Sequence, residues 1–327
     1  MIISLDIAVE RWPIAGTFTI SRGSKTEAAI VVCTLSDGVH SGRGECVPYA
    51  RYGESIDSVC AEIEGLRDAL SKGATRNDLP GLIHAGAARN AVDCALWDLE
   101  AKRQGTSVTS LLGLPELHDL TTAVTVSFGD AATMAKAASG FADRPLIKVK
   151  VGGENDAERI RAVALAAPSS RIIIDANEGW TNANILENML ACARAGIALI
   201  EQPLPAGNDA ILAEIPHPVP ICADESAHGT DDLHKLLGRY DSINIKLDKT
   251  GGLTEALRMH NRARELGFGI MVGCMVGTSL AMAPAVIVAQ DADFVDLDGP
   301  LILKQDRTPG LEFNGSRVSP PKPELWG

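Results

Sequence analysis

The chain is poor in aromatic residues and has none of the compact cysteine or histidine motifs that hold zinc or exchange disulfides. Aromatic residues make up 4% of its 327 residues. The seven cysteines form no CxxC pair, and the seven histidines include no HExxH arrangement. This pattern argues against a zinc or redox centre, and it is typical of reduced thiols buried in a cytoplasmic protein.

Positive charge and long hydrophobic stretches are also scarce. The net charge of −12 argues against nucleic acid and anionic membrane surfaces as partners. The N-terminus lacks the basic and apolar regions of a signal peptide. One run of 19 residues, 271–289, is free of charge but contains Pro284, and we interpret it as a buried strand, a loop and a helix. We therefore expect a cytoplasmic protein.

From residue 121 onward the chain alternates short β-rich runs with helix-like segments. The β-rich runs are almost continuously apolar, as are parallel strands buried on both faces. Eight such units predict an α/β fold with a (β/α)8 barrel, in which functional residues come from the carboxyl ends of the strands. A polar residue stands near the end of each run, at intervals of about 25 residues: Thr125, Lys150, Asp175, Glu201, Asp224, Lys246, Cys274 and Asp298.

The beginning and the end of the chain follow other patterns. Three extended stretches and then two helices indicate a separate α+β domain before the barrel. The last residues are extended and proline-rich, so they either return to pack on this domain or are disordered. The expected domains are residues 1–115, 116–300 and 301–327, and the extended stretches lie near 2–12, 18–35 and 40–48.

Two lysines stand one residue apart in the run "RPLIKVKVGGEND". Side chains at i and i+2 of a strand share a face, so Lys148 and Lys150 would project together. Either this is the solvated face of an edge strand, or it is a site that uses an amine base whose pKa is lowered by neighbouring positive charge. Because strands two and six face each other in an eight-stranded barrel, Lys150 and Lys246 would reach opposite sides of a bound molecule.

Three acids end the strands between those two lysines. Taken singly, Asp175, Glu201 and Asp224 could each cap the next helix. As a set they would repel one another unless a cation held them, and all-oxygen donors favour Mg²⁺, for which Mn²⁺ can substitute, over Zn²⁺. The implied reaction is abstraction of a proton α to a carboxylate, with the metal and Lys148 stabilising the enolate. A base and an acid on opposite sides would invert a stereocentre.

Together these motifs resemble the enolase superfamily, in its muconate-lactonizing subgroup. The matching segments are "KVK" at 148–150, the Asp, Glu, Asp series, "NIKLDKTGG" at 244–252 and the helix signature "GAARNAVDCALWDLEAKR". The resemblance covers nearly the whole chain. It implies a modified (β/α)8 barrel of the TIM type, a capping N-terminal domain that supplies specificity loops, a Mg²⁺ ion, and Lys150 and Lys246 as acid and base.

Further segments resemble the dipeptide epimerases of that subgroup, the L-Ala-D/L-Glu epimerases. They are "GECVPYARYGES", "CADESAH", "GCMVGTS" and "FVDLDGP". In this group an acidic pair, here Asp296 and Asp298, binds the α-ammonium of the dipeptide, although the pair could also cap a turn. The resemblance further implies substrate contacts from Thr125 and Cys274. It implies that Arg22 or Arg51 pairs with the glutamate side-chain carboxylate.

We therefore expect an isomerase that epimerises the glutamate α-carbon of L-Ala-D/L-Glu dipeptides, in the recycling of murein peptides. The nearest alternatives are o-succinylbenzoate synthase, N-acylamino-acid racemase and muconate cycloisomerase, whose substrates carry no free α-ammonium. A Schiff-base lyase that uses Lys246 and a non-catalytic binding protein are alternatives of other classes. The sequence leaves open whether the chain forms a homo-oligomer.

Overall fold

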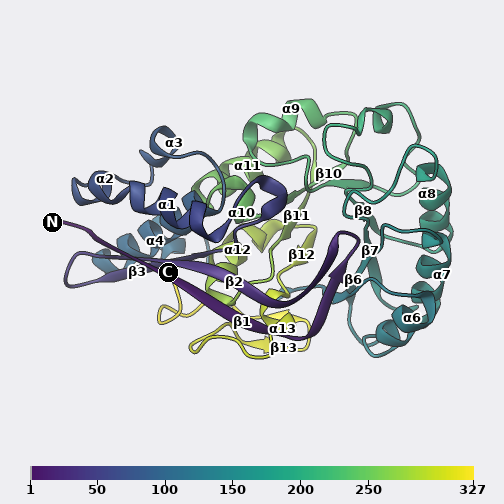
Figure 1. The fold of residues 1–327 in the computed structure, drawn as a ribbon, viewed down its shortest axis with the longest axis horizontal. Helices are drawn as coiled ribbons and strands as arrows, with labels where there is room; N and C mark the ends of the chain where they lie inside the picture. Colours follow the sequence, from purple (N-terminus) through teal and green to yellow (C-terminus); the bar gives the residue numbers. More distant parts are fainter. Residues whose placement is uncertain (1) are drawn as a thin grey trace.

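Eight parallel strands form the centre of the larger part of the chain (Figure 1). The computed structural model describes residues 2–327. The order of the strands in the sheet follows their order along the chain, and a hydrogen bond from Ala123 N to Val295 O, 2.8 Å long, links the two ends of the sheet. The predicted (β/α)8 barrel is thereby confirmed. Its strands are β5 (Val124–Val126), β6 (Leu146–Lys150), β7 (Arg171–Asp175), β8 (Leu199–Glu201), β9 (Ile221–Ala223), β10 (Ser242–Ile245), β11 (Gly269–Gly273) and β12 (Phe294–Asp296).

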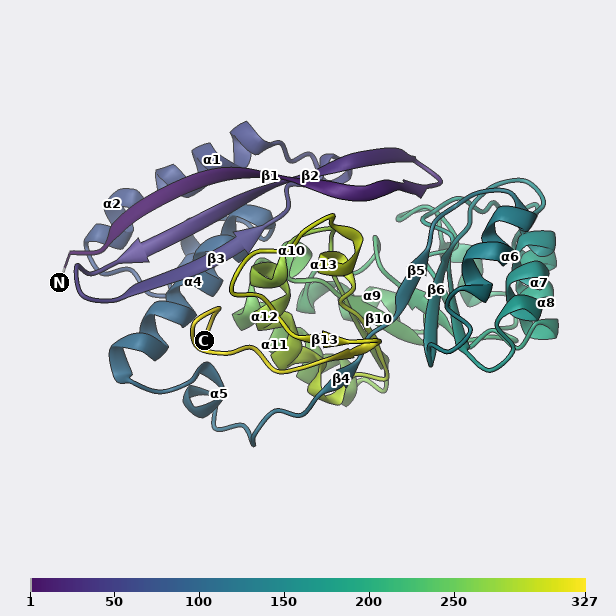
Figure 2. The same ribbon diagram turned by 90° about the horizontal axis from the view of Figure 1, so that it is seen from below.

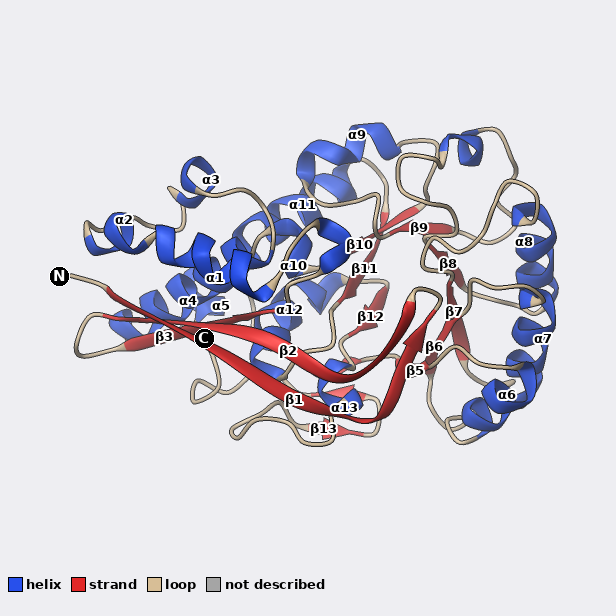
Figure 3. Ribbon diagram, viewed as in Figure 1, coloured by secondary structure: helices blue, strands red, loops and turns tan. Residues whose placement is uncertain are grey.

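The outer layer of helices departs from that of a regular (β/α)8 barrel (Figure 3). Full helices follow five strands, whereas short turns follow β8, β9 and β12. Within the described part of the chain, none of the helices is long and apolar enough to cross a membrane. The longer helices are α6 (Ala131–Ser139), α7 (Asp156–Ala166), α8 (Ile185–Arg194), α11 (Leu253–Glu265) and α12 (Ser279–Val288). The short elements are η2 (Ala210–Ala213), η3 (Thr230–Asp232), α9 (Leu233–Leu236), α10 (Leu247–Thr250), η4 (Ala289–Asp291) and α13 (Gly299–Ile302).

The N-terminal region is an antiparallel three-stranded sheet with helices packed against it (Figure 2). Gly42 and Gly44 let the sheet approach α4 (Ala87–Gln104) closely, because a Cβ atom at either position would collide with the backbone of that helix. This arrangement confirms the predicted α+β domain. Its elements are β1 (Ser4–Ile20), β2 (Gly23–Ser36), β3 (Ser41–Cys46), η1 (Ala50–Tyr52), α1 (Ile56–Gly65), α2 (Arg67–Ser71), α3 (Leu79–Leu82), α4 (Ala87–Gln104) and α5 (Val108–Leu111).

The hairpin of β1 and β2 extends beyond this sheet and reaches the mouth of the barrel (Figures 1 and 2). The sequence predicted one extended stretch over residues 18–35. That prediction is wrong, because the chain reverses at Ser21 and Arg22 between the two strands. The reversal is helped by Gly23, whose φ of 141° is disfavoured for other residues. The tip of the hairpin thereby lines the cavity at the barrel mouth.

The C-terminal segment returns to the N-terminal region. It pairs β14 (Arg317–Val318) with β13 (Phe313–Asn314) and β4 (Leu120–Thr121). Trp326 is buried, and its Nε1 donates a hydrogen bond of 3.0 Å to Cys94 O in α4. The tail is therefore ordered against this helix. The division of the chain after residues 115 and 300 stays a prediction.

Candidate active site

The strand-end residues predicted from the sequence meet at one mouth of the barrel. Lys150, Asp175 and Glu201 are the last residues of β6, β7 and β8. In the register of the sheet, Lys150 lies opposite Asp175, and Asp175 lies opposite Glu201. Asp224 and Lys246 come directly after β9 and β10. The carboxyl ends of parallel strands thus bring these charges into one row.

A cavity of about 940 Å³ lies between this mouth and the β1–β2 hairpin. Asp175 and Glu201 do not line the cavity, and both are completely buried. The other ten predicted residues all do: Arg22, Arg51, Thr125, Lys148, Lys150, Asp224, Lys246, Cys274, Asp296 and Asp298.

Lys150 and Lys246 reach the cavity from opposite strands of the barrel. Since β6 and β10 are four places apart in a ring of eight, they face each other across its centre. Lys150 Nζ lies 2.6 Å from Asp175 Oδ2, and Lys246 Nζ lies 2.6 Å from Asp224 Oδ2. The edge-strand alternative is excluded, because β6 lies between β5 and β7 and both of its lysines are buried.

The Lys148 ammonium lies among several carboxylates. Its Nζ is 2.7 Å from Glu201 Oε2, 3.1 Å from Asp175 Oδ2 and 2.7 Å from Asp296 Oδ2. The contact with Glu201 is ionic only, because Glu201 Oε2 accepts no hydrogen bond of good geometry. Lys148 therefore offsets negative charge that would otherwise be buried without a partner.

The three strand-end acids have the donor chemistry of a hard divalent cation. Asp175, Glu201 and Asp224 are buried and offer only carboxylate oxygens. Within residues 2–327, no three acidic, cysteine or histidine side chains are grouped tightly enough to enclose a metal ion as they stand. The carboxylates point at lysines instead. Holding a cation would require them to turn from those lysines towards one another.

Burial and pairing shift the pKa values in this cluster strongly. Burial raises the pKa of Glu201 to about 7, and the charge of Asp175 adds to the effect. Burial lowers the pKa of Lys246, but the Asp224 and Glu201 carboxylates more than offset this, and the pKa ends well above its ordinary value. The ammonium form of Lys246 is therefore favoured over the free amine in this arrangement. Its carboxylate partners outweigh the positive charge of its neighbours.

Two residues of the "NIKLDKTGG" segment were not singled out from the sequence. Lys249 Nζ is buried and donates to Asp224 Oδ1 at 2.6 Å and to Asn244 O at 2.9 Å. Asn244 Nδ2 donates to Glu201 Oε1 at 2.7 Å. Both residues therefore hold acids of the predicted metal set. The sequence did offer a signal that Lys249 and Asn244 belong to the site, because both lie in the same segment as Lys246.

Asp296 and Asp298 have different surroundings, although they lie on the same wall of the cavity. Asp296 is paired with Lys148. Burial raises the pKa of Asp298 to about 7, the charge of Asp296 raises it further, and a hydrogen bond from the Thr125 side chain opposes the shift. Burial raises the pKa of the neighbouring Cys274 thiol well above its ordinary value, which makes a thiolate there unfavourable.

The two predicted arginines already have carboxylate partners. Arg22, in the hairpin turn, donates to Glu225 Oε1 at 2.8 Å and to Asn177 O at 2.7 Å. Arg51 donates a hydrogen bond of 2.8 Å to each carboxylate oxygen of Glu178. Glu178 and Glu225, which sequence reasoning missed, thus tie the N-terminal region to the barrel loops. Glu225 lies within the segment "CADESAH", which was the available signal for it, whereas Glu178 lies in none of the segments that carried the resemblance.

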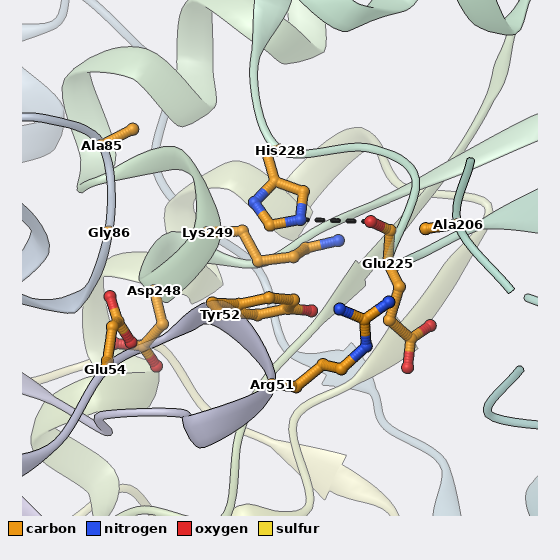
Figure 4. Close-up of a pocket in the computed structure, with 10 residues that line it drawn as sticks. All are labelled: Arg51, Tyr52, Glu54, Ala85, Gly86, Ala206, Glu225, His228, Asp248 and Lys249. Carbon is orange, nitrogen blue, oxygen red and sulfur yellow. Dashed lines mark hydrogen bonds between the residues drawn. The ribbon is translucent and has the colours of Figure 1, made fainter.

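A second cavity of about 410 Å³ adjoins this part of the site (Figure 4). The rings of Tyr52 and His228 meet edge to face across it, with centroids 4.6 Å apart. His228 Nε2 lies 3.1 Å from Glu225 O, the contact that Figure 4 marks. Arg51 and Lys249 also line this space. The two cavities share four lining residues: Arg51, Tyr52, Glu54 and Glu225.

Two family models match almost the whole chain, and the chain belongs to the enolase superfamily. The "Mandelate racemase / muconate lactonizing enzyme, N-terminal domain" model matches residues 2–113. The "Enolase C-terminal domain-like" model matches residues 128–322. These matches confirm the resemblance stated from the motifs.

Two curated relatives cover the chain almost completely. L-Ala-D/L-Glu epimerase of Escherichia coli (strain K12) is 47% identical over 95% of this chain and 97% of the relative. N-acetyl-D-glutamate racemase of a Pseudoalteromonas species is 43% identical over 91% of this chain and 95% of the relative. Both relatives are isomerases of glutamate derivatives.

Two solved structures are similar to this chain over nearly its whole length. An enolase family member from Agrobacterium tumefaciens with homology to dipeptide epimerases, with bound sodium and L-Ala-L-Glu, is 58% identical with a TM-score of 0.98, and the match covers 99% of this chain and 100% of that one. The dipeptide epimerase of Cytophaga hutchinsonii, complexed with Mg and the dipeptide D-Ala-L-Val, is 29% identical with a TM-score of 0.91, over 98% and 94% of the two chains.

Proposed function

We propose that this protein epimerises the glutamate α-carbon of L-Ala-D/L-Glu dipeptides. The observation that carries the proposal is the placement of Lys150 and Lys246 on opposite strands around one cavity. A carbon held between two amines can lose a proton to one and gain a proton from the other on its opposite face. The Escherichia coli relative at 47% identity supports this choice of substrate.

The proposed reaction moves one proton off the α-carbon and another onto it. One lysine, as the free amine, accepts the α-proton, and the electron pair of the broken C–H bond moves into the substrate carboxylate as an enolate. The opposite lysine, as the ammonium, donates a proton to the other face and restores the carboxylate. Lys148, almost fully buried beside them, would offset the added negative charge of the enolate.

We also propose that Asp175, Glu201 and Asp224 hold Mg²⁺, with Mn²⁺ able to substitute. Bound there, a divalent cation would polarise the substrate carboxylate and make the α-proton more acidic. Lys249 and Asn244, which contact two of these acids, would help to orient them. The Cytophaga hutchinsonii dipeptide epimerase, a structural neighbour, is complexed with Mg.

Racemisation of an N-acetyl-glutamate is the second candidate. The relative of that activity is 43% identical to this chain. The pairing of Asp296 with Lys148 also weakens the charge argument against an N-acylated substrate, since only Asp298 is left to face an ammonium. The two candidates share the same lysines and differ only in the group attached to the glutamate nitrogen.

A cytoplasmic location and a role in murein peptide recycling complete the proposal. The seven cysteines are free thiols in the structure, as suits a reducing compartment. A small dipeptide is the expected partner.

Proton NMR in D₂O tests the activity directly. L-Ala-L-Glu with the protein and Mg²⁺ should lose its glutamate α-proton signal and gain signals of the other diastereomer, and a chelator should stop both changes. N-acetyl-L-glutamate, run in parallel, decides between the candidates. Exchange with the N-acetyl compound alone would overturn the choice of a dipeptide. Exchange with neither compound would overturn the proposed function.

A further inference from the structure

The loop between β11 and α12, residues 274–278, forms part of the wall of the larger cavity next to Asp298. Met275 of this loop lines the cavity together with Asp298 and Gly299. The loop packs closely against Gly299, where an added Cβ atom would lie 3.0 Å from Met275 O and 3.2 Å from Gly277 O. The position of Asp298, which directly precedes that glycine, therefore depends on the position of the loop.

Glu45 holds this loop from the side of the N-terminal sheet. It is the next-to-last residue of β3, only 1% of its surface is exposed, and it does not line the cavity. Thr278, the last residue of the loop, donates two hydrogen bonds to its carboxylate: one of 2.7 Å from the backbone N to Oε1, and one from the hydroxyl to Oε2. A Cβ atom on Gly277 would lie 2.9 Å from the same Oε1. Two consecutive residues of the loop are therefore in contact with one buried carboxylate.

Arg307, from the C-terminal segment, completes the network and offsets its charge. Arg307 Nη2 lies 3.0 Å from Glu45 Oε2, and Arg307 Nε donates to Thr278 Oγ1 at 2.6 Å. A buried carboxylate without such partners would be strongly destabilising, whereas buried polar groups whose hydrogen bonds are all made fix one geometry. The network therefore fixes where the β11–α12 loop lies, and it does so with residues from three separate parts of the chain.

We propose that Glu45 is a positioning residue for Asp298, and that it acts through the β11–α12 loop without touching the substrate. The inference rests on the proposed function, in which Asp298 faces the ammonium of the dipeptide, and deepens it. If the carboxylate no longer holds the loop, the carbonyl groups that pack against Gly299 can shift, and Asp298 shifts with them. Lys150 and Lys246 are paired with other carboxylates, so they should stay in place. Loss of the contact should therefore weaken substrate binding rather than proton transfer.

A double-mutant cycle tests whether Glu45 acts through Asp298. Glu45→Gln keeps the size of the side chain and one acceptor for Thr278, but it removes the charge that pairs with Arg307 and turns one acceptor into a donor. We expect KM for L-Ala-L-Glu to rise by about 10-fold, with kcat changed by less than about 3-fold. In the Asp298→Asn background the same substitution should change KM by less than about 3-fold, because the charge that Glu45 positions is already gone.

Asp93→Asn is the matched control. Like Glu45, Asp93 is a buried acid that accepts hydrogen bonds from the N and the Oγ1 of one threonine, here Thr254. This threonine belongs to α11 instead of the β11–α12 loop. Asp93→Asn should therefore change KM by less than about 2-fold. A rise in KM that is confined to Glu45→Gln is then not a general effect of removing a buried charge.

Thermal unfolding shows first whether the variants are folded, and Thr278→Val, which removes only the hydroxyl group, replaces Glu45→Gln if that variant is not. Unchanged KM in a folded variant would overturn the inference. So would a rise of about 10-fold in both backgrounds, because Glu45 would then act independently of Asp298. If the wild type exchanges no glutamate α-proton, the proposed function fails. Calorimetric affinities of the same variants for L-Ala-L-Glu then complete the cycle and still decide whether Glu45 acts through Asp298.

Discussion

The Lys148 ammonium lies 2.7 Å from the Asp296 carboxylate, so the acidic pair after β12 is already half neutralised by the protein. Asp298 lies on the same cavity wall without a lysine at salt-bridge distance among residues 2–327. Sequence reasoning treated the two acids as one binding pair, but we now expect them to have different tasks. We propose that Asp298 is the one that meets a substrate ammonium.

Asp298→Asn should therefore weaken dipeptide binding selectively. We expect KM for L-Ala-L-Glu to rise by about 10- to 100-fold, because the ammonium loses its charged partner. N-acetyl-L-glutamate, which has no ammonium, should be affected much less. Asp296→Asn should instead lower kcat for both compounds, since it changes the charge around Lys148. Steady-state kinetics with both substrates check the contrast, and equal effects of Asp298→Asn on both would contradict it.

Because the two lysines are opposed, we expect α-proton exchange by each single-lysine variant to depend on which isomer of the dipeptide is supplied. Lys150→Ala and Lys246→Ala should each lower epimerisation by about 10²- to 10⁴-fold, the usual contribution of a general acid or base. The lysine that remains faces only one side of the α-carbon. In D₂O each variant should therefore retain slow α-proton exchange with one isomer of L-Ala-Glu, and the two variants should retain it with opposite isomers. Retention with the same isomer would show that the lysines do not face opposite sides.

The strand-end residues of the site could be predicted from the sequence, whereas their partners from loops could not. The repeat of strand-end polar residues located Lys150, Asp175 and Glu201 correctly, because parallel strands of one barrel must end at one mouth. Burial of Lys148 was not deducible, since the same alternation fits an edge strand. The partners of Arg22 and Arg51 were beyond reach as well. Glu178 and Glu225 come from loops whose closeness to the hairpin depends on how the two domains pack.

Lys249 should control metal affinity without contacting the substrate. Its ammonium donates to both Asp224 Oδ1 and Asp224 O, which holds this acid in place. Lys249→Met should weaken Mg²⁺ binding about 10- to 100-fold, as is usual when a residue that orients a metal ligand is removed. Titration calorimetry with Mg²⁺ measures the affinity directly, and thermal unfolding shows whether the variant is folded. Unchanged affinity in a folded variant would remove Lys249 from this role.

We expect Asp93 to make stability fall as the pH rises. It is buried in α4 and accepts hydrogen bonds from Thr254 N at 3.0 Å and Thr254 Oγ1 at 2.6 Å. Burial raises its pKa to about 6, and the hydrogen bonds from Thr254 only partly offset this. Between its ordinary pKa of about 4 and this value, the unfolded chain loses the proton before the folded chain does, so folding is progressively disfavoured.

The loss should amount to about 3 kcal/mol and be complete above pH 6, since a tenfold change in proton affinity corresponds to roughly 1.4 kcal/mol. Asp93→Asn cannot titrate. The free energy of unfolding of the variant minus that of the wild type should therefore increase between pH 4 and pH 7, whatever its value at pH 4. Urea denaturation at a series of pH values measures this difference. A difference that stays constant over that range would show that folding does not raise the pKa of Asp93.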